Sequence, residues 1–281
     1  MSKVAVIGIV GNSVFLPVEK FHVGGETVEA KSVHFELGGK GFNQAVAAAR
    51  YGAQVSFLAA VGEDSYEKVK AFLNKENINA VIAKKQENTA FAAIVTDEKG
   101  SNRVTVYQGA RLSVNDVLAF ERAIKEADIL LLNNEVSEEV NVKAVEIAKN
   151  YGVKVVLNPA PARKNCDYIL QNVDLFTPNE HETLGLEEKE NVVVTLGGAG
   201  CLLKSSNTKI PPMKVKAIDT TGAGDTFNGV LTACLAENAN MEKAIKTATV
   251  AAGISVTRKY AVSSIPAKKE IDDFLDIIKN R

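Results

Sequence analysis

The sequence has few of the residues that build disulfide frameworks, metal centres or charged binding surfaces. Its three cysteines, Cys166, Cys201 and Cys234, are widely separated and form no Cys-x-x-Cys pair, which indicates a reduced, cytoplasmic protein. Its three histidines show no spacing typical of a metal site or a catalytic dyad. Lys and Arg number 33 and Asp and Glu 34, so neither a nucleic acid nor a membrane surface is expected as a partner.

Long hydrophobic runs are also missing. The apolar start, MSKVAVIGIVGNSV, is too short to span a bilayer and lacks a small-residue cleavage pattern, so we interpret it as a buried first strand. Hydrophobic residues make up 46% of the 281, which is enough for a sizeable core. We therefore expect one large domain over residues 1–281.

Short apolar runs alternate with helical patterns along most of the chain. Strands are expected at residues 4–10, 55–61, 129–132, 153–157 and 192–196. Helices are expected near residues 42–49 and over residues 113–127, 137–150, 223–237, 241–256 and 266–280. Continuous apolar strands need cover on both faces, so the pattern predicts an α/β fold with a doubly wound, mostly parallel sheet flanked by helices.

Three other segments, ETVEAKSVHFEL (26–37), AFAAIVT (90–96) and RVTVYQ (103–108), alternate between apolar and polar residues over all or part of their length. Alternation with a period of two is typical of a sheet with one wet face. These strands therefore do not fit the central sheet. We expect a small β-sheet lid, inserted at about residues 13–37 and 90–108.

The stretch IDTTGAGDTFNGVL (218–231) places glycines and one carboxylate at the start of an expected helix. Glycines allow close approach of a ligand, and the first helical N–H groups form a positive end that suits a phosphate. Asp225 at this end either stabilises the helix dipole alone or accepts a proton from an attacking hydroxyl. Phosphoryl transfer needs such a cradle and such a base together.

Motifs along nearly the whole chain resemble one enzyme family. DTTGAGDTFNGVL (219–231) closely resembles the C-terminal signature of the ribokinase-like (PfkB) carbohydrate kinases, and ELGGKGFNQAVAAARYGAQVSFLAAVGED (36–64) is similar to their N-terminal signature. NPAPAR (158–163), TPNEHE (177–182), VTLGGAG (194–200) and ISVTRK (254–259) follow in family order. The resemblance implies a kinase that uses ATP and Mg²⁺, with K⁺ as a further ion, to phosphorylate a primary hydroxyl of ribose or a related furanose or nucleoside.

The resemblance assigns roles around the acceptor sugar. Asp225 would be the catalytic base, and the backbone of Gly222, Ala223 and Gly224 would bind the transferred phosphate. Sugar-binding residues would be Gly39, Lys40, Asn43, Glu135 and Ser13. Without the resemblance, GGKG (38–41) is a glycine-rich bend, and Glu135 is an acid at the start of a helix.

The resemblance also assigns the nucleotide and ion sites. Asn179, Thr195, Gly197 and Gly200 would lie near ATP. Glu182 would organise Mg²⁺ through water, although Asn179 and Glu182 also have the spacing of a helix capping box. Asp219 and Thr221, with the loop 256–264, would hold a monovalent cation, or Asp219 would only hydrogen-bond its own turn.

The sequence departs from the family at three places. Ser13 stands where the family usually has an aspartate that grips sugar hydroxyls, and Tyr260 stands where it generally has glycine. The segment after Glu182 is also short, which predicts a trimmed edge on the nucleotide side.

Three functions are consistent with these patterns to different degrees. The intact GAGD motif favours an ATP-dependent sugar kinase, and the missing sugar-side acid supports a non-catalytic sugar or nucleotide sensor as the alternative. A nicotinamide dehydrogenase is disfavoured, because the glycines at 197, 198 and 200 do not follow Gly-x-Gly-x-x-Gly. Lid strands with an apolar face also favour pairing as a homodimer.

Overall fold

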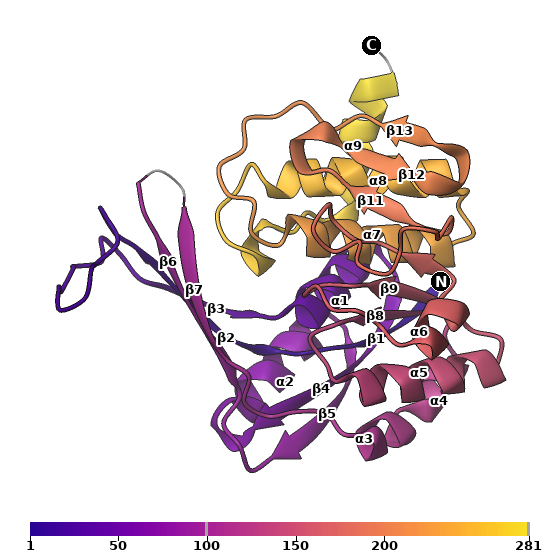
Figure 1. Cartoon of the computed structure of the whole chain (residues 1–281), viewed down its shortest axis with the longest axis horizontal. Coiled ribbons are helices and arrows are strands. Elements are labelled where there is room, and N and C mark those ends of the chain that lie inside the picture. The colour runs from indigo at the N-terminus through magenta and orange to yellow at the C-terminus, as the bar shows by residue number, and fades with distance from the viewer. Residues whose placement is uncertain (99–100, 280–281) are drawn as a thin grey trace.

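The computed structural model describes residues 1–98 and 101–279 of the chain. Its body is a six-stranded parallel sheet in the order β10-β9-β8-β1-β4-β5 (Figure 1). These strands are β1 (Lys3–Ile7), β4 (Gln54–Gly62), β5 (Asn79–Lys85), β8 (Ile129–Asn133), β9 (Lys154–Asn158) and β10 (Leu175–Phe176). The strand order runs outward from β1 in both directions, which confirms the predicted doubly wound sheet.

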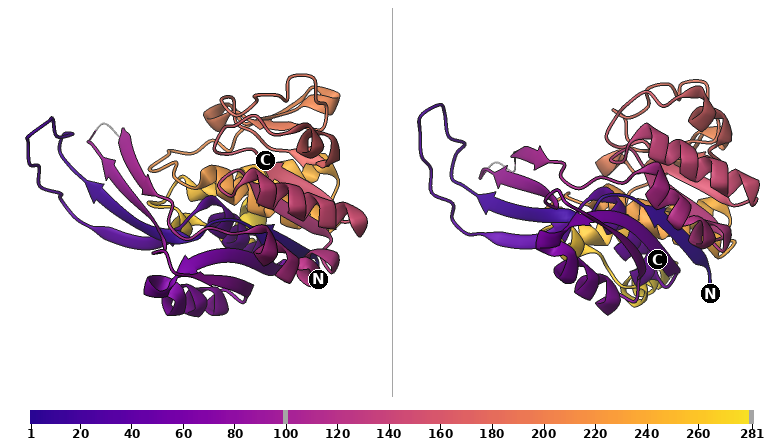
Figure 2. Two further views of the ribbon diagram at one scale, coloured as in Figure 1. Left: turned by 60° about the horizontal axis from the view of Figure 1, so that its bottom comes forward. Right: turned by 90° about the horizontal axis from the view of Figure 1, so that it is seen from below.

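Helices cover both faces of this sheet (Figures 1 and 2). One face carries α1 (Lys40–Tyr51), α2 (Tyr66–Lys75), α7 (Ala223–Ala236), α8 (Met241–Ser255) and α9 (Lys268–Lys279). The other face carries α3 (Val114–Ala119), α4 (Glu121–Lys125), α5 (Glu138–Asn150) and α6 (Asp167–Asn172). Val4 and Val6 of β1 enter the first core, and Ala5 and Ile7 enter the second. This alternation buries the apolar strands on both faces, as the sequence predicts.

A separate four-stranded sheet, here called the lid sheet, projects from one side of the body (Figure 2). Its strands are β3 (His34–Gly38), β2 (Gly11–Pro17), β6 (Ala90–Thr96) and β7 (Asn102–Tyr107), in that order across the sheet. Of the segment 26–37 that the sequence predicts as lid strand, only the part from His34 onward is a strand. Residues 99–100 of the predicted lid insert lie outside the described residues.

Apart from an isolated parallel bridge between Val192 and Phe176 of β10, the predicted strand at 192–196 does not belong to the central sheet. Its core, β11 (Val193–Thr195), pairs antiparallel with β12 (Cys201–Leu203), which pairs with β13 (Thr208–Ile210) in a third sheet. The connection through residues 177–191 contains turns and no helix, and parallel pairing with this segment is limited to the isolated bridges Phe176–Val192 and Asn179–Thr195. The short glycine turn at 197–200 instead folds the chain straight back on β11.

Several boundaries differ from the prediction. The single helix expected at 113–127 is two short helices that meet at Phe120, whose side chain is completely buried in the second core. The helix α2 and strand β5 were not predicted; only Val69 and Leu73 of α2 are buried, and β5 is an edge strand with no buried residue. The last helix begins at Lys268, and its predicted end at residue 280 lies outside the described residues. Short 3-10 helices occupy Glu63–Ser65, Gly197–Ala199, Lys204–Ser206 and Val262–Ser264.

No helix in the described part of the chain has both the length and the apolar character required to cross a membrane.

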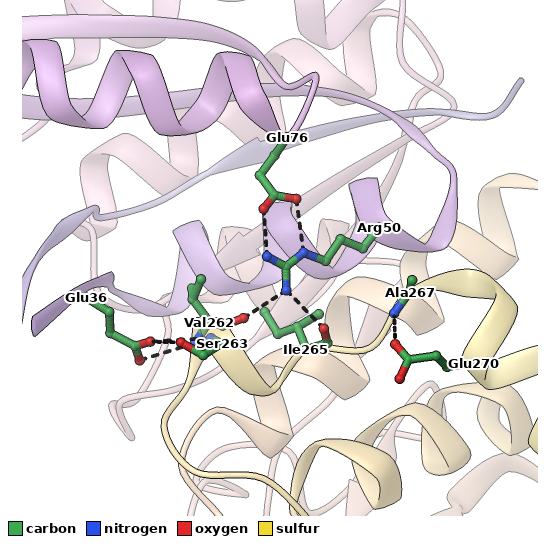
Figure 3. A network of polar contacts seen from close by, with 8 residues as sticks. All are labelled: Glu36, Arg50, Glu76, Val262, Ser263, Ile265, Ala267 and Glu270. Atoms are coloured by element: carbon green, nitrogen blue, oxygen red, sulfur yellow. Dashed lines mark hydrogen bonds and ion pairs between the residues drawn. The ribbon is translucent and has the colours of Figure 1, made fainter. Parts of the chain in front are cut away.

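Arg50 fixes the C-terminal end of α1. Its Nε and Nη2 donate to the two carboxylate oxygens of Glu76 at 3.0 and 2.6 Å, and its Nη1 donates to the carbonyl oxygens of Val262 and Ile265 at 2.9 and 3.0 Å (Figure 3). Only 22% of the Arg50 side chain and 15% of Glu76 are exposed. One guanidinium therefore joins α1, the end of α2 and the loop before α9.

We predict that Arg50→Met lowers the free energy of unfolding by about 2–3 kcal/mol, because Glu76 and two carbonyl groups lose their partner in a mostly buried setting. Chemical denaturation measures this loss. Arg122→Met is the matched control, since the side chain of Arg122 is 89% exposed and pairs only with Glu126 along its own helix turn. A loss no larger than that of the control would show that the Arg50 network does not stabilise the fold.

Candidate active site

Asp225 lies at the N-terminal end of α7 and is only 7% exposed. Gly222 forms the N-cap with a φ of 74°, in the left-handed region that favours glycine. Asn43 Nδ2 donates to Asp225 Oδ2 at 2.9 Å, and Gln44 Nε2 donates to Asp225 Oδ1 at 3.2 Å. Both donors come from α1, so the packing of α1 against α7 determines the position of the carboxylate.

A ring of buried polar residues supports this carboxylate. Gln44 Nε2 also lies 3.1 Å from Asn158 Oδ1, and Asn158 Nδ2 donates to the carbonyl of Thr177 at 2.9 Å. The hydroxyl of Thr177 donates a hydrogen bond to Asn228 Oδ1, and Asn228 Nδ2 donates to the carbonyl of Gly224 at 2.8 Å. The ring leads from α7 through α1, β9 and the turn after β10 back to α7, and so fixes the first turn around Asp225.

The charges around Asp225 shift its pKa in opposing ways. Burial raises the pKa of Asp225 above its ordinary value, whereas Lys40 and the bonds from Asn43 and Gln44 lower it. Asp225 is the main cause of a raised pKa at Lys40, with smaller contributions from Glu135 and Glu182. Lys40 therefore remains a cation among three carboxylates, and Asp225 is a stronger base than an exposed aspartate.

Glu135 follows β8 and faces the start of α1. The backbone N–H of Lys40 donates to Glu135 Oε2 at 2.7 Å, and the N–H of Glu135 itself donates to Asn133 Oδ1 at 3.0 Å. Burial, and next the charge of Asp225, raises the pKa of Glu135 to about 7. Glu135 therefore changes its charge near neutral pH.

Glycines allow the start of α1 to approach β1 closely. A Cβ at Gly41 would lie 2.5 Å from the Cα of Gly8, and one at Gly39 would lie 2.5 Å from the carbonyl oxygen of Ile9. Gly39 also has a φ of 106°. The GGKG segment is thus the tight bend that the sequence suggests, and it brings Lys40 and Asn43 to Asp225.

Ser13 belongs to the lid sheet and is only partly buried. Its Oγ lies 2.7 Å from where a Cβ on Gly38 would be, so Ser13 lies over the GGKG bend. The neighbouring Asn12 is already bonded, because its Nδ2 donates to Ser65 Oγ at 2.7 Å and its Oδ1 accepts from Lys68 Nζ at 2.8 Å. This part of the lid sheet therefore offers the site a neutral hydroxyl.

A cavity of about 760 Å³ adjoins the N-terminal end of α7 on the other side. The sequence-predicted nucleotide residues Asn179, Thr195, Gly197 and Gly200 all line it, together with Ala223 and Gly224. The structure therefore brings these residues together next to the anion-binding helix end.

Further lining residues of this cavity were not anticipated. The segment 212–217 contributes Met213, and α8 contributes Gly253, where a Cβ would lie 2.6 Å from that of Met213. Gln44 and Asn158 of the polar ring were missed too, since single amides within a helix and at a strand end have no recognisable spacing. Of these missed residues, only those of the segment PPMKVKA (211–217) could have been suspected from the sequence, because they lie shortly before the GAGD motif.

Asn179 and Glu182 make only one of the two bonds of a capping box, with no helix after them, because the side-chain oxygen of Asn179 accepts from the N–H of His181 and not from that of Glu182. The N–H and Nδ2 of Asn179 donate to the Glu182 carboxylate at 3.0 and 2.8 Å. Residues 180–188 form turns instead. The pair therefore stabilises a turn at the cavity edge, with Glu182 close enough to act on the charge of Lys40.

Asp219 binds two neighbouring segments. Its Oδ1 accepts from the N–H and the hydroxyl of Thr221 at 2.9 and 2.6 Å, and its Oδ2 accepts from the N–H of Tyr260 at 2.8 Å. Tyr260 has a φ of 72°, and its ring stacks on His34 with centroids 3.6 Å apart. Asp219 therefore bonds its own turn and also fixes the loop that carries Tyr260.

The lid sheet contacts this same loop through Glu36, which the sequence did not single out. Its carboxylate accepts hydrogen bonds from the N–H groups of Val262 and Ser263 and from the hydroxyl of Ser263 (Figure 3). It also accepts from the N–H of Ala261 at 2.8 Å. The side chain of Glu36 is nearly buried. The inner face of the lid sheet is thus bonded to the body beside the candidate site.

Comparison with known proteins identifies relatives along nearly the whole chain. Residues 1–268 match the pfkB family carbohydrate kinases. A ribokinase of Haemophilus influenzae is 37% identical, over 96% of this chain and 97% of its own length. The structure of a ribokinase from Thermotoga maritima superposes with a TM-score of 0.88 at 34% identity, covering 98% of this chain and all of that one. That of Arabidopsis thaliana ribokinase with ribose and ATP gives 0.84 at 25% identity, covering 98% and 99%.

Proposed function

The chain belongs to the pfkB family of carbohydrate kinases, and we propose that it transfers the γ-phosphate of ATP to a primary hydroxyl of ribose or a related furanose. The observation that carries this proposal is the buried Asp225, which two donors from α1 hold at the N-terminal end of α7. Nothing in the described site or in the comparisons favours the non-catalytic alternative.

The geometry assigns a role to each side of Asp225. ATP would occupy the 760 Å³ cavity, with its γ-phosphate at the N–H groups of residues 222–224. The acceptor sugar would lie between the GGKG bend and the lid sheet, near Lys40, Asn43, Glu135 and Ser13. Asp225 would accept the proton of the attacking hydroxyl, and the positive end of α7 would stabilise the charge on the transferring group.

The ions of the reaction are part of the proposal. Mg²⁺ neutralises charge on the phosphates of ATP when it is bound, and it needs few protein ligands because it retains waters. Among the described residues no three His, Cys, Asp or Glu side chains are placed so that they could hold a metal ion together, and we propose that phosphates hold the ion, with Glu182 acting through water. A monovalent cation at Asp219 and Thr221 stays a prediction, since three donors already bond that carboxylate. The three free cysteines are consistent with a cytoplasmic location.

We further propose a homodimer formed through the outer face of the lid sheet. Strand register places Phe35, Phe91 and Tyr107 on one face, where they are 64%, 39% and 52% exposed. The opposite face carries Ser13 and Glu36, of which Glu36 bonds the body, and also the exposed Val104 and Val106. An apolar sheet face of this kind is typical of an interface between two copies.

For the kinase function, we predict that ADP release from ATP and Mg²⁺ with ribose or a related furanose falls about 10²- to 10⁴-fold in Asp225→Asn, because the base for the hydroxyl is lost. A coupled assay measures kcat, and calorimetry measures nucleotide binding, which the variant should retain. Asp272→Asn, the same change at an exposed position of α9, is the control. Activity of Asp225→Asn at the level of the control would contradict the proposal.

For Glu135, we predict that kcat/KM for the acceptor falls as the pH is lowered through about 7. The carboxylate then becomes protonated and accepts hydrogen bonds from sugar hydroxyl groups less well. The group ionises above this pH, so activity is retained on the alkaline side. A pH profile of the native chain and of Glu135→Gln tests this. The fall in kcat/KM near pH 7 should disappear in the variant. If the fall remains in Glu135→Gln, another group causes it.

For the dimer, we predict that the native chain sediments as a dimer at micromolar concentration and that Phe35→Glu sediments as a monomer, because a charge would be buried in the apolar face. Ile277→Glu, which changes a half-exposed residue of α9, should leave the dimer intact. A native monomer, or a dimer unaffected by Phe35→Glu, would exclude this face as the interface.

A further inference from the structure

The loop at residues 260–263 is bonded to two carboxylates from different parts of the chain. Asp219, in the turn before α7, accepts the N–H of Tyr260 at 2.8 Å. Glu36, on the lid strand β3, accepts the N–H groups of the next three residues at 2.8, 3.3 and 3.3 Å. Four successive N–H groups of the loop therefore join the turn before α7 to the lid sheet.

The same loop packs directly against the N-cap of α7. A Cβ at Gly222 would lie 3.1 Å from the Cβ of Ala261 and 3.2 Å from its Cα. Asp219, which bonds the loop, also accepts the N–H and the hydroxyl of Thr221, the residue before Gly222. The proposed function assigns the transferred phosphate to the backbone of residues 222–224. A shift of the loop would therefore displace the backbone that receives this phosphate.

Tyr260 has a backbone conformation that its surroundings must maintain. Its φ of 72° lies in the left-handed region, which is unfavourable for a bulky side chain. Its ring stacks on His34 of β3, and it meets Phe15 of β2 edge-on with centroids 5.1 Å apart. Both partners belong to the lid sheet. Backbone strain of this kind gathers at functional sites, which supports a role for this contact beyond folding.

Glu36 is well placed to connect the lid sheet with the phosphate side of the site. Its side chain is only 8% exposed, and it precedes Lys40 of the GGKG bend by four residues. Its Oε1 accepts the N–H groups of Ala261 and Val262, and its Oε2 accepts the N–H and the hydroxyl of Ser263. Hydrogen bonds to an ionised acceptor are stronger than neutral ones, so four of them fix the loop on β3.

We propose that Glu36 is a positioning residue for phosphoryl transfer, which holds the loop 260–263 against Gly222 and so keeps the phosphate-binding backbone in its productive geometry. This inference rests on the proposed kinase function and concerns the same site. Glu36 takes no part in making or breaking bonds; it acts through the loop. The lid sheet, which would cover the acceptor, and the backbone that binds the γ-phosphate are thereby positioned together.

The first test is the kinetics of Glu36→Gln, which removes the charge and the oxygen that binds Ser263 but nearly preserves the size of the side chain. With ATP, Mg²⁺ and ribose, or the furanose that the native chain uses best, kcat should fall between about tenfold and 10²-fold, because the donors to the transferring group are displaced. KM for the acceptor should stay nearly unchanged. Glu29→Gln, at an exposed position in the loop between β2 and β3, should keep native kcat.

A second variant tests the loop side of the same contact. Ser263→Ala removes a donor to Glu36 from an exposed residue, so the chain should fold. Its kcat should fall by a smaller factor than that of Glu36→Gln. The double variant should be no slower than Glu36→Gln alone, because both changes break one contact. All rates are compared well below the melting temperature of each variant.

Calorimetry gives a measurement that needs no turnover. ADP and AMP-PNP, a non-hydrolysable analogue of ATP, differ in the terminal phosphoryl group that the backbone of residues 222–224 would bind. The affinity of Glu36→Gln for AMP-PNP should be about tenfold lower than that of the native chain, and its affinity for ADP should be the same.

Two results would overturn the inference. One is a higher acceptor KM with native kcat in Glu36→Gln, which would place the effect on the acceptor alone. The other is native kcat and native AMP-PNP affinity with only a lowered melting temperature, which would show a purely structural role. A native chain that phosphorylates no acceptor would instead refute the proposed function, and the calorimetry would still decide whether Glu36 positions the phosphate-binding backbone.

Discussion

The site depends on the close packing of α1 against α7. A Cβ at Gly229 of α7 would lie 2.4 Å from the backbone oxygen of Gln44 and 2.6 Å from the Cβ of Ala47, so only glycine permits this approach. The same contact brings Asn43 and Gln44 to Asp225. A carboxylate that is nearly inaccessible to water needs such donors, because an unpaired buried charge would destabilise the fold.

Each end of α1 is fixed by a different device. Gly39 and Gly41 press its N-terminus against the end of β1, and Arg50 bonds its C-terminus to Glu76 and to the loop before α9. That loop continues into the segment that Glu36 bonds to the lid sheet. The helix α1 and its contacts therefore position Asp225, the GGKG bend and the lid sheet. An accurately placed catalytic group requires such rigid support.

The sequence predicted the parts of the structure that depend on local pattern. Apolar runs identified four of the six strands of the central sheet, β1, β4, β8 and β9, and the GGKG and GAGD segments predicted the two loops that meet at Asp225. It could not show that residues 193–195 pair in a third sheet and not in the central one, because that choice depends on which strands lie beside them in the fold. Nor could it select Gln44 or Asn158, whose roles come from partners far away in the sequence.

The most direct test of the α1–α7 contact is the activity of Gly229→Ala. Alanine favours a helix, so the variant should fold, but its Cβ would push Gln44 and Asn43 away from Asp225. A displacement of about 1 Å at a reacting group can cost about 10²-fold, and we expect kcat to fall between about tenfold and 10²-fold, with an unchanged circular dichroism spectrum. Gly24→Ala, where a Cβ meets nothing within 4 Å, should keep native activity. Full activity of a folded Gly229→Ala variant would show that the close contact does not position the base.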